Sequence, residues 1–136
     1  MATTQESCAP VTRAGLEEFV RALMAEEIYD KATGVATFAD GSPCINCING
    51  AIRIAEAFGG KVYGYWSSAN PTAEVGQQDL DGHDFAVIGE RWIVDYWVYT
   101  TLDLLSSPVL DLHDEADLAL AQRLLGDRGA WEIVRA

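Results

Sequence analysis

Hydrophobic residues recur at helical spacing near the start of the chain. Between residues 13 and 30 they come every three or four positions, at Leu16, Phe19, Val20, Leu23, Met24 and Ile28. This spacing predicts an amphipathic helix over 13–30, with Thr12 as a suitable N-cap. Residues 1–11 lack such a pattern, and we expect them to form a loose N-terminal tail.

A second helical pattern follows residues 31–42, whose small and turn-forming residues predict a loop. Ser42 is a favourable N-cap, and Pro43 suits the first helical position, where its missing N–H is not needed. Apolar positions then continue at helical spacing as far as Gly59-Gly60, which predicts the end of the helix. The pattern therefore predicts a helix that begins at Ser42-Pro43.

Segments rich in β-branched and aromatic residues predict the strands, at 61–66, 83–88, 91–98 and, more weakly, 130–134. Two of them are separated by little more than Gly89-Glu90, which predicts a hairpin. The polar segment 67–82 predicts a long connection.

A last helix is expected around 114–125, with Asp114 as its cap and Gly126 at its end. Helices and strands that do not alternate regularly predict an α+β fold. A chain of 136 residues suits one hydrophobic core, so we expect a single domain over 12–136.

The charge of the chain narrows the classes of partner. The net charge is −12 and the chain has only nine Lys and Arg residues. We therefore expect neither nucleic acid nor an anionic membrane surface as a partner, because both are bound through basic side chains. The chain has no signal-type N-terminus and no apolar run near 20 residues, which favours a cytoplasmic protein or one exported by a signal-less route.

Two of the three cysteines, Cys44 and Cys47, form a Cys-x-x-Cys pair at the predicted helix start. A zinc site would need two further ligands, and His83 and His113 occur in unrelated contexts, so no metal site is expected. A thioredoxin-like redox pair would follow a core strand, which ATFADGS does not resemble. Three interpretations stay open: a redox pair, buried apolar thiols, or a nucleophile whose thiolate is stabilised by the helix N-terminus.

A nucleophilic thiol needs a base and a group that orients the base. His83 opens one strand of the predicted hairpin, and Asp95 lies in the other. A two-residue loop would put Asp95 on the opposite face of the hairpin from His83. A three-residue loop, 89–91, would put both on the same face, so a Cys–His–Asp triad requires the longer loop.

These residues resemble the papain-like cysteine hydrolase superfamily, in particular compact bacterial papain-fold toxin and protein-glutamine deamidase domains. The matching segments lie within residues 42–98 and read CINCINGA, GHDFAVIG and RWIVDYW. The resemblance implies a papain-like core, with the nucleophile helix packed on a small antiparallel sheet and extra N- and C-terminal helices. It also implies His83 as the general base and Asp95 as the orienting acid.

We expect Cys44 to be the nucleophile, because the predicted Ser-Pro cap places it at the helix start. Cys47 is the alternative, because the papain-style order of such a pair favours the second cysteine. Papain-type enzymes carry a glutamine shortly before the nucleophile, but this chain has none between Gln5 and Gln77. The remaining oxyanion donors are backbone N–H groups near the cysteine and the side chains of three polar residues, Asn46, Gln77 and Gln78.

The resemblance and the residues together predict a cysteine-dependent amide hydrolase that needs no cofactor and acts on protein substrates through a thioester. Glutamine deamidation is the preferred version, and peptide cleavage and transglutamination share the same acyl-enzyme step. The acidity of the chain favours a basic protein partner. The alternatives are a non-catalytic effector-adaptor or immunity-type binding module, and a thiol redox protein.

Overall fold

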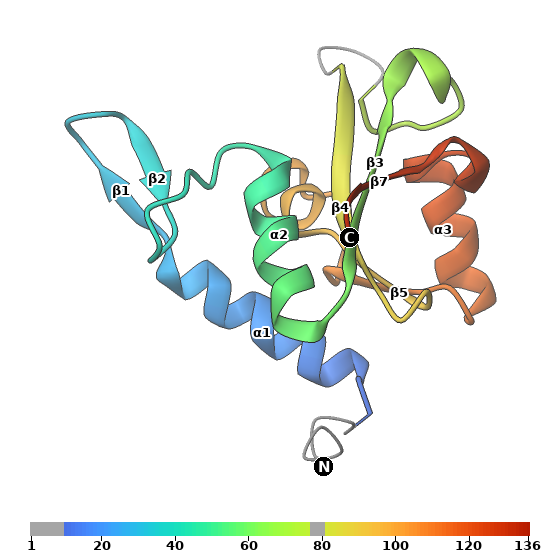
Figure 1. Ribbon diagram of the computed structural model, residues 1–136, viewed down its shortest axis with the longest axis horizontal. Coiled ribbons are helices and arrows are strands. Elements are labelled where there is room, and N and C mark those ends of the chain that lie inside the picture. The colour runs from blue at the N-terminus through green and yellow to red at the C-terminus, as the bar shows by residue number, and fades with distance from the viewer. Residues whose placement is uncertain (1–9, 77–80) are drawn as a thin grey trace.

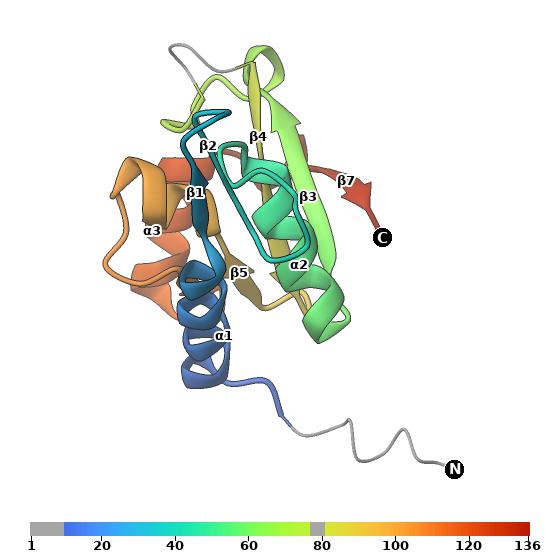
Figure 2. The same cartoon turned by 90° about the vertical axis from the view of Figure 1, so that its left-hand side faces the viewer.

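A five-stranded antiparallel sheet forms the centre of the computed structural model, which describes residues 10–76 and 81–136. The strand order is β6-β5-β4-β3-β7, so β6 and β7 are the two edges. Figure 2 shows β7 beside β3 at one of these edges. The strands are β3 (Lys61–Trp66), β4 (Gly82–Ile88), β5 (Trp92–Val94), β6 (Val109–Asp111) and β7 (Glu132–Arg135).

Helices cover both faces of the sheet. Helices α1 (Arg13–Glu26) and α2 (Cys47–Phe58) lie on one face, and α3 (Glu115–Leu125) lies on the other (Figure 1). The predicted caps of the outer helices are confirmed, because Thr12 accepts the N–H of Gly15 and Asp114 accepts that of Asp117. These helices and the antiparallel sheet agree with the expected α+β class.

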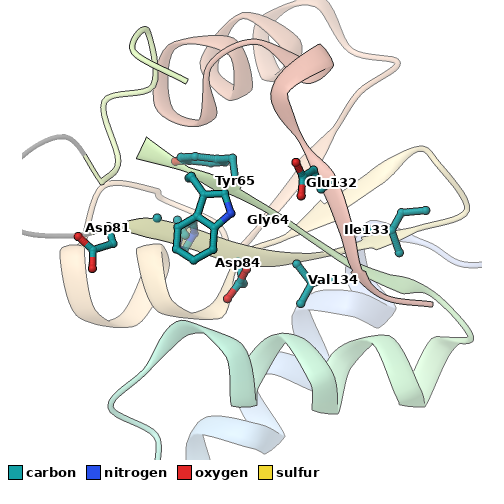
Figure 3. Close-up of a pocket in the computed structure, with 10 residues that line it drawn as sticks. Gly64, Tyr65, Asp81, Asp84, Glu132, Ile133 and Val134 are labelled. Atoms are coloured by element: carbon teal, nitrogen blue, oxygen red, sulfur yellow. The ribbon is translucent and has the colours of Figure 1, made fainter. Parts of the chain in front are cut away.

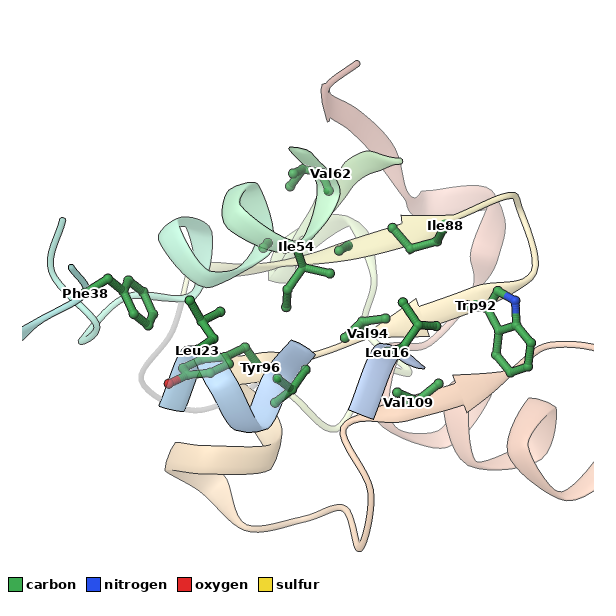
Figure 4. Close-up of a cluster of buried hydrophobic side chains, with 14 of the residues drawn as sticks. Leu16, Leu23, Phe38, Ile54, Val62, Ile88, Trp92, Val94, Tyr96 and Val109 are labelled. Atoms are coloured by element: carbon green, nitrogen blue, oxygen red, sulfur yellow. The ribbon is translucent and has the colours of Figure 1, made fainter. Parts of the chain in front are cut away.

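The side chains of β4 alternate between two hydrophobic clusters, one on each face of the sheet. Ala86 and Ile88 belong to the cluster beneath α1 and α2, whereas Phe85 and Val87 belong to the cluster beneath α3. Figure 4 shows the first cluster, in which side chains of the helices and the strands converge. Since neighbouring residues of a strand point to opposite faces, β4 contributes to both clusters.

The segment after α1 differs from the prediction. A helix over 13–30 and a loop over 31–42 were expected, but α1 ends at Glu26 and a short hairpin follows. Its strands, β1 (Ile28–Asp30) and β2 (Val35–Thr37), project away from the sheet (Figure 1). Gly34 supplies the left-handed backbone of the turn, at φ 73°.

The strand predictions were correct in the middle of the sheet and incomplete at its edges. The predictions 61–66, 83–88 and 130–134 correspond to β3, β4 and β7. The segment 91–98 forms a strand only over β5, and the chain then turns into a short π-helix at Val98–Leu102. Within the described ranges 10–76 and 81–136, no helix is both long and apolar enough to cross a bilayer.

Candidate active site

His83 and Asp95 are brought together by the hairpin of β4 and β5. Ile88 pairs with Trp92, which leaves three residues, 89–91, in the loop between them. This is the loop length that puts His83 and Asp95 on one face. His83 Nε2 lies 2.6 Å from Asp95 Oδ2, and each of the two residues is only 2% exposed.

Asp95 is held in place by the backbone that follows it. Its Oδ1 accepts the N–H of Val98 at 3.0 Å, and its own N–H donates to the carbonyl of Pro108 at 2.9 Å. The carboxylate therefore starts the helical turn after β5 with one oxygen and binds the imidazole with the other. Both oxygens of this buried carboxylate therefore have partners, as buried polar groups generally do.

The pKa of His83 results from two opposing effects. Burial of the ring disfavours its protonation, but the charge and hydrogen bond of Asp95, with a smaller contribution from Cys47, outweigh this effect and raise the pKa to about 10. The other ring nitrogen, Nδ1, is the only buried side-chain N or O atom in residues 10–76 and 81–136 that makes no hydrogen bond. Nε2 of the ring is thus bonded to Asp95, whereas Nδ1 is buried without a hydrogen bond within these ranges.

Cys47 is the first residue of α2, and Asn46 is its N-cap. The side-chain oxygen of Asn46 accepts the N–H of Asn49 at 3.3 Å. The predicted helix start at Ser42-Pro43 is therefore wrong. The chain stays extended there, because the Ser42 carbonyl accepts the N–H of Phe38 at 2.9 Å and Pro43 forms a β-bridge with Thr37.

The Cys47 thiol lies between β4 and the start of α2. Its Sγ is 3.7 Å from Asp84 Oδ2, and it interacts closely enough with His83 to help raise the pKa of the imidazole. Its side chain is partly exposed. The thiol therefore lies at the positive end of the α2 dipole and donates to the Asp84 carboxylate.

Cys44 occupies a different environment. It is buried in the cluster beneath α1 and α2, and its N–H donates to the Ala36 carbonyl at 2.9 Å. Burial, reinforced by the nearby carboxylates of Glu27, Asp40 and Glu26, raises the pKa of its thiol to about 11. The expectation that Cys44 lies in the first turn of the helix is wrong, and Cys47 occupies that position instead.

Trp97 connects the cysteine segment to the histidine. Its Nε1 donates to the carbonyl of Ile45 at 3.0 Å, and its ring lies 5.7 Å from the His83 ring. Helix α2 also approaches this turn closely at Gly50, where a Cβ atom would lie 3.0 Å from the Tyr96 side chain. The sequence pattern placed Tyr96 and Trp97 in a strand. It did not predict that they contact α2 and the cysteine segment.

The expected oxyanion donors can be located only in part. Asn46 is exposed beside Cys47, but its side-chain oxygen is engaged as the helix cap. Gln77 and Gln78 lie outside the described residues. The first N–H groups of any α-helix lack partners within that helix, so the start of α2 offers backbone donors next to the thiol.

A pocket of about 490 Å³ opens beside these side chains. Its lining comes from β3, β4 and β7 and from the segment before β4, and it includes His83 and Asp84. In Figure 3 Asp84 projects from the sheet toward α2, while Asp81 and Ile133 lie at opposite ends of the group of lining residues. The pocket therefore shares one wall with the candidate site.

Within the described ranges, the His, Cys, Asp and Glu side chains form no group of three or more that could hold a metal ion. Comparison of the chain with protein-family models, with curated proteins and with solved structures found no match.

Proposed function

We propose that the chain is a cysteine-dependent amide hydrolase with a papain-like core. Cys47 is the nucleophile, His83 the general base and acid, and Asp95 the group that orients His83. One observation carries the proposal: a buried histidine is hydrogen-bonded to a buried aspartate at 2.6 Å and has its second nitrogen unpartnered, near a thiol at a helix N-terminus. This matches the nucleophile–base–orienter arrangement of acyl-transfer enzymes.

The reaction follows from these positions. The Cys47 thiolate attacks the carbonyl carbon of an amide, and a C–S bond forms while the imidazolium of His83 protonates the leaving nitrogen. Ammonia leaves from a glutamine side chain, or an amine leaves from a peptide bond, and a thioester remains. Neutral His83 then takes a proton from water, the resulting hydroxide attacks the thioester, and the C–S bond breaks to release a carboxylate.

The ion-pair character of the site supports this cycle. Asp95 raises the pKa of His83, so the ring holds a proton at neutral pH that it can give to a leaving nitrogen. The imidazole of His83 and the positive end of the α2 dipole both act at the Cys47 sulfur that attacks the amide. The preference for protein glutamine over a peptide bond rests on the resemblance to glutamine deamidase domains alone.

Thiol reactivity tests the proposal first. We expect iodoacetamide at pH 6 to label Cys47 stoichiometrically in the folded protein and to leave Cys44 unlabelled, because Cys44 is buried. Peptide mapping by mass spectrometry distinguishes the two sites. The labelling rate of Cys47 should fall at least tenfold in His83→Gln, a variant that retains a polar side chain in the buried site.

Turnover tests the reaction itself. Ammonia release from glutamine-containing proteins should be abolished in Cys47→Ala and retained in Cys44→Ala, the matched control. If Cys47 labels slowly and its rate does not depend on His83, the hydrolase is ruled out in favour of a binding module. A reversible disulfide between Cys44 and Cys47 with a mid-range potential would instead favour the redox alternative.

A further inference from the structure

We propose that the pocket beside Cys47 binds a lysine or arginine side chain of the substrate, next to the attacked amide. This inference rests on the proposed function, because it assigns the substrate class of the same site. It follows from the charges that line the pocket, from an unsatisfied histidine in its wall and from its exposed apolar residues.

The lining of the pocket carries more acidic than basic side chains. Its lining includes the carboxylates of Asp81, Asp84 and Glu132, and none of its ten lining residues is Lys or Arg. In the described part of the chain, none of these three carboxylates forms an ion pair with a basic side chain. The one basic lining residue is His83, whose charge is already matched by Asp95. An incoming cation would therefore meet three unmatched carboxylates.

Asp84 places this negative charge next to the reacting sulfur. Its Oδ2 lies 3.7 Å from Cys47 Sγ, and its carboxylate packs over Gly64, where a Cβ atom would come within 2.1 Å of Oδ1. Burial raises the pKa of Asp84 more than the charge of His83 and the hydrogen bond from Cys47 lower it, so a further positive group would stabilise the charged form. A substrate cation would supply that group.

The wall of the pocket also contains an atom that awaits a partner. His83 lines the pocket, is 2% exposed, and leaves Nδ1 without a hydrogen bond among the described residues. Buried polar atoms are nearly always satisfied, and in the proposed site this nitrogen serves Cys47 and the amide that Cys47 attacks. The amide to be cleaved would occupy this end, and the cation would extend along the carboxylates.

Exposed apolar side chains complete the fit. Trp66 is 62% exposed, and Ile133 and Val134 are each 51% exposed, although all three line the pocket. Lys and Arg carry long aliphatic stems that pack on such surfaces, and their charged ends bind to aromatic faces as well as to carboxylates. An acidic substrate side chain would be repelled here, and a purely apolar one would leave the carboxylates without compensation.

Charged thiol reagents test the electrostatic potential at Cys47 without requiring turnover. The probes are a trimethylammonium-ethyl and a sulfonatoethyl methanethiosulfonate, and the readout is the rate of modification of the Cys47 peptide, normalised to a small free thiol. We expect the cationic reagent to react at least tenfold faster than the anionic one. The ratio of the cationic to the anionic modification rate should drop at least threefold in Asp84→Asn and in Glu132→Gln. It should be unchanged in Glu90→Gln, a matched control in the β4–β5 loop.

The same ratio in all four proteins would overturn the inference, because the preference would then reflect net charge alone. A parallel assay compares kcat/KM for peptides in which Lys or Glu precedes the glutamine, with an expected preference for Lys of tenfold or more. Turnover without this preference overturns the pocket assignment and retains the hydrolase. The reagent preference without any turnover retains a cation-binding pocket and overturns the hydrolase.

Discussion

At the scale of single residues, the site depends on Asp95, which joins a strand end, a helical turn and the imidazole. Its two oxygens bind the Val98 N–H and His83, so its charge is compensated although the residue is buried. Removal of either partner would leave an unmatched charge in the interior, which typically costs several kcal/mol. The pair is therefore important for folding as well as for the proposed chemistry.

The pH dependence of unfolding should reveal this pair. Because the pKa of His83 is raised to about 10 in the folded protein, its stabilising contribution is complete below the unfolded value of about 6.5 and is lost as the pH rises through 10. Urea unfolding of the wild type should lose stability between pH 6.5 and 10 more steeply than His83→Gln, by about 1.4 kcal/mol for each unit of the shift. Parallel curves would show that the histidine is not paired in solution.

The family resemblance predicted His83 and Asp95 as partners, on the condition that the hairpin loop has three residues, because strand alternation then puts both on one face. The sequence pattern favoured Cys44 over Cys47 as the nucleophile, because both fit the start of a helix and their burial depends on distant segments. The position of Cys44 is set by backbone pairing with Ala36, a contact that local spacing does not reveal. The pocket carboxylates were also missed, because they come from segments that meet only in the folded sheet.

At the scale of elements, the start of α2 decides which cysteine is positioned to react. The sequence offers two good caps, Ser42 and Asn46, four residues apart, and local preference alone does not choose between them. The choice is made by β2, whose Thr37 pairs with Pro43 and keeps the chain extended. Tertiary pairing thus overrides a favourable Ser-Pro signal.

Substitution of the caps tests this assignment. Asn46→Ala removes the side-chain acceptor for the Asn49 N–H and should lower the free energy of unfolding by about 1 kcal/mol. Ser42→Ala removes only an exposed hydrogen bond to Asp40 and should cost less. Chemical denaturation of both variants measures the difference. A larger loss in Ser42→Ala would mean that the helix begins at Ser42.

At the scale of the whole molecule, the sequence predicted the layers better than the edges. Hydrophobic spacing, cap residues and turn-forming residues were enough to predict the α1 cap, β3, β4 and α3. The strands β1, β2 and β6 have three residues each, too few to show an alternating pattern. Their existence depends on partners elsewhere, as β6 depends on β5.

The net charge of −12 gives the molecule a predictable response to salt. Repulsion among its carboxylates is screened as ionic strength rises, so stability should increase, on the order of 1 kcal/mol between 0.02 and 0.5 M NaCl. Thermal or urea unfolding at pH 7 measures this change. A decrease would show that the surface ion pairs, such as Arg53–Glu26 and Arg91–Asp111, outweigh the repulsion.

The three-residue loop between β4 and β5 has a consequence for insertions and deletions. Exposed loops normally accept changes of length, yet this one sets the parity that brings Asp95 to His83. One residue added at Gly89 would turn either strand over or shift its pairing, and would separate the two side chains. A second added residue restores the parity. In a library of loop lengths, loops with an odd number of residues should therefore be tolerated better than loops with an even number, although the loop lies far from any reacting atom.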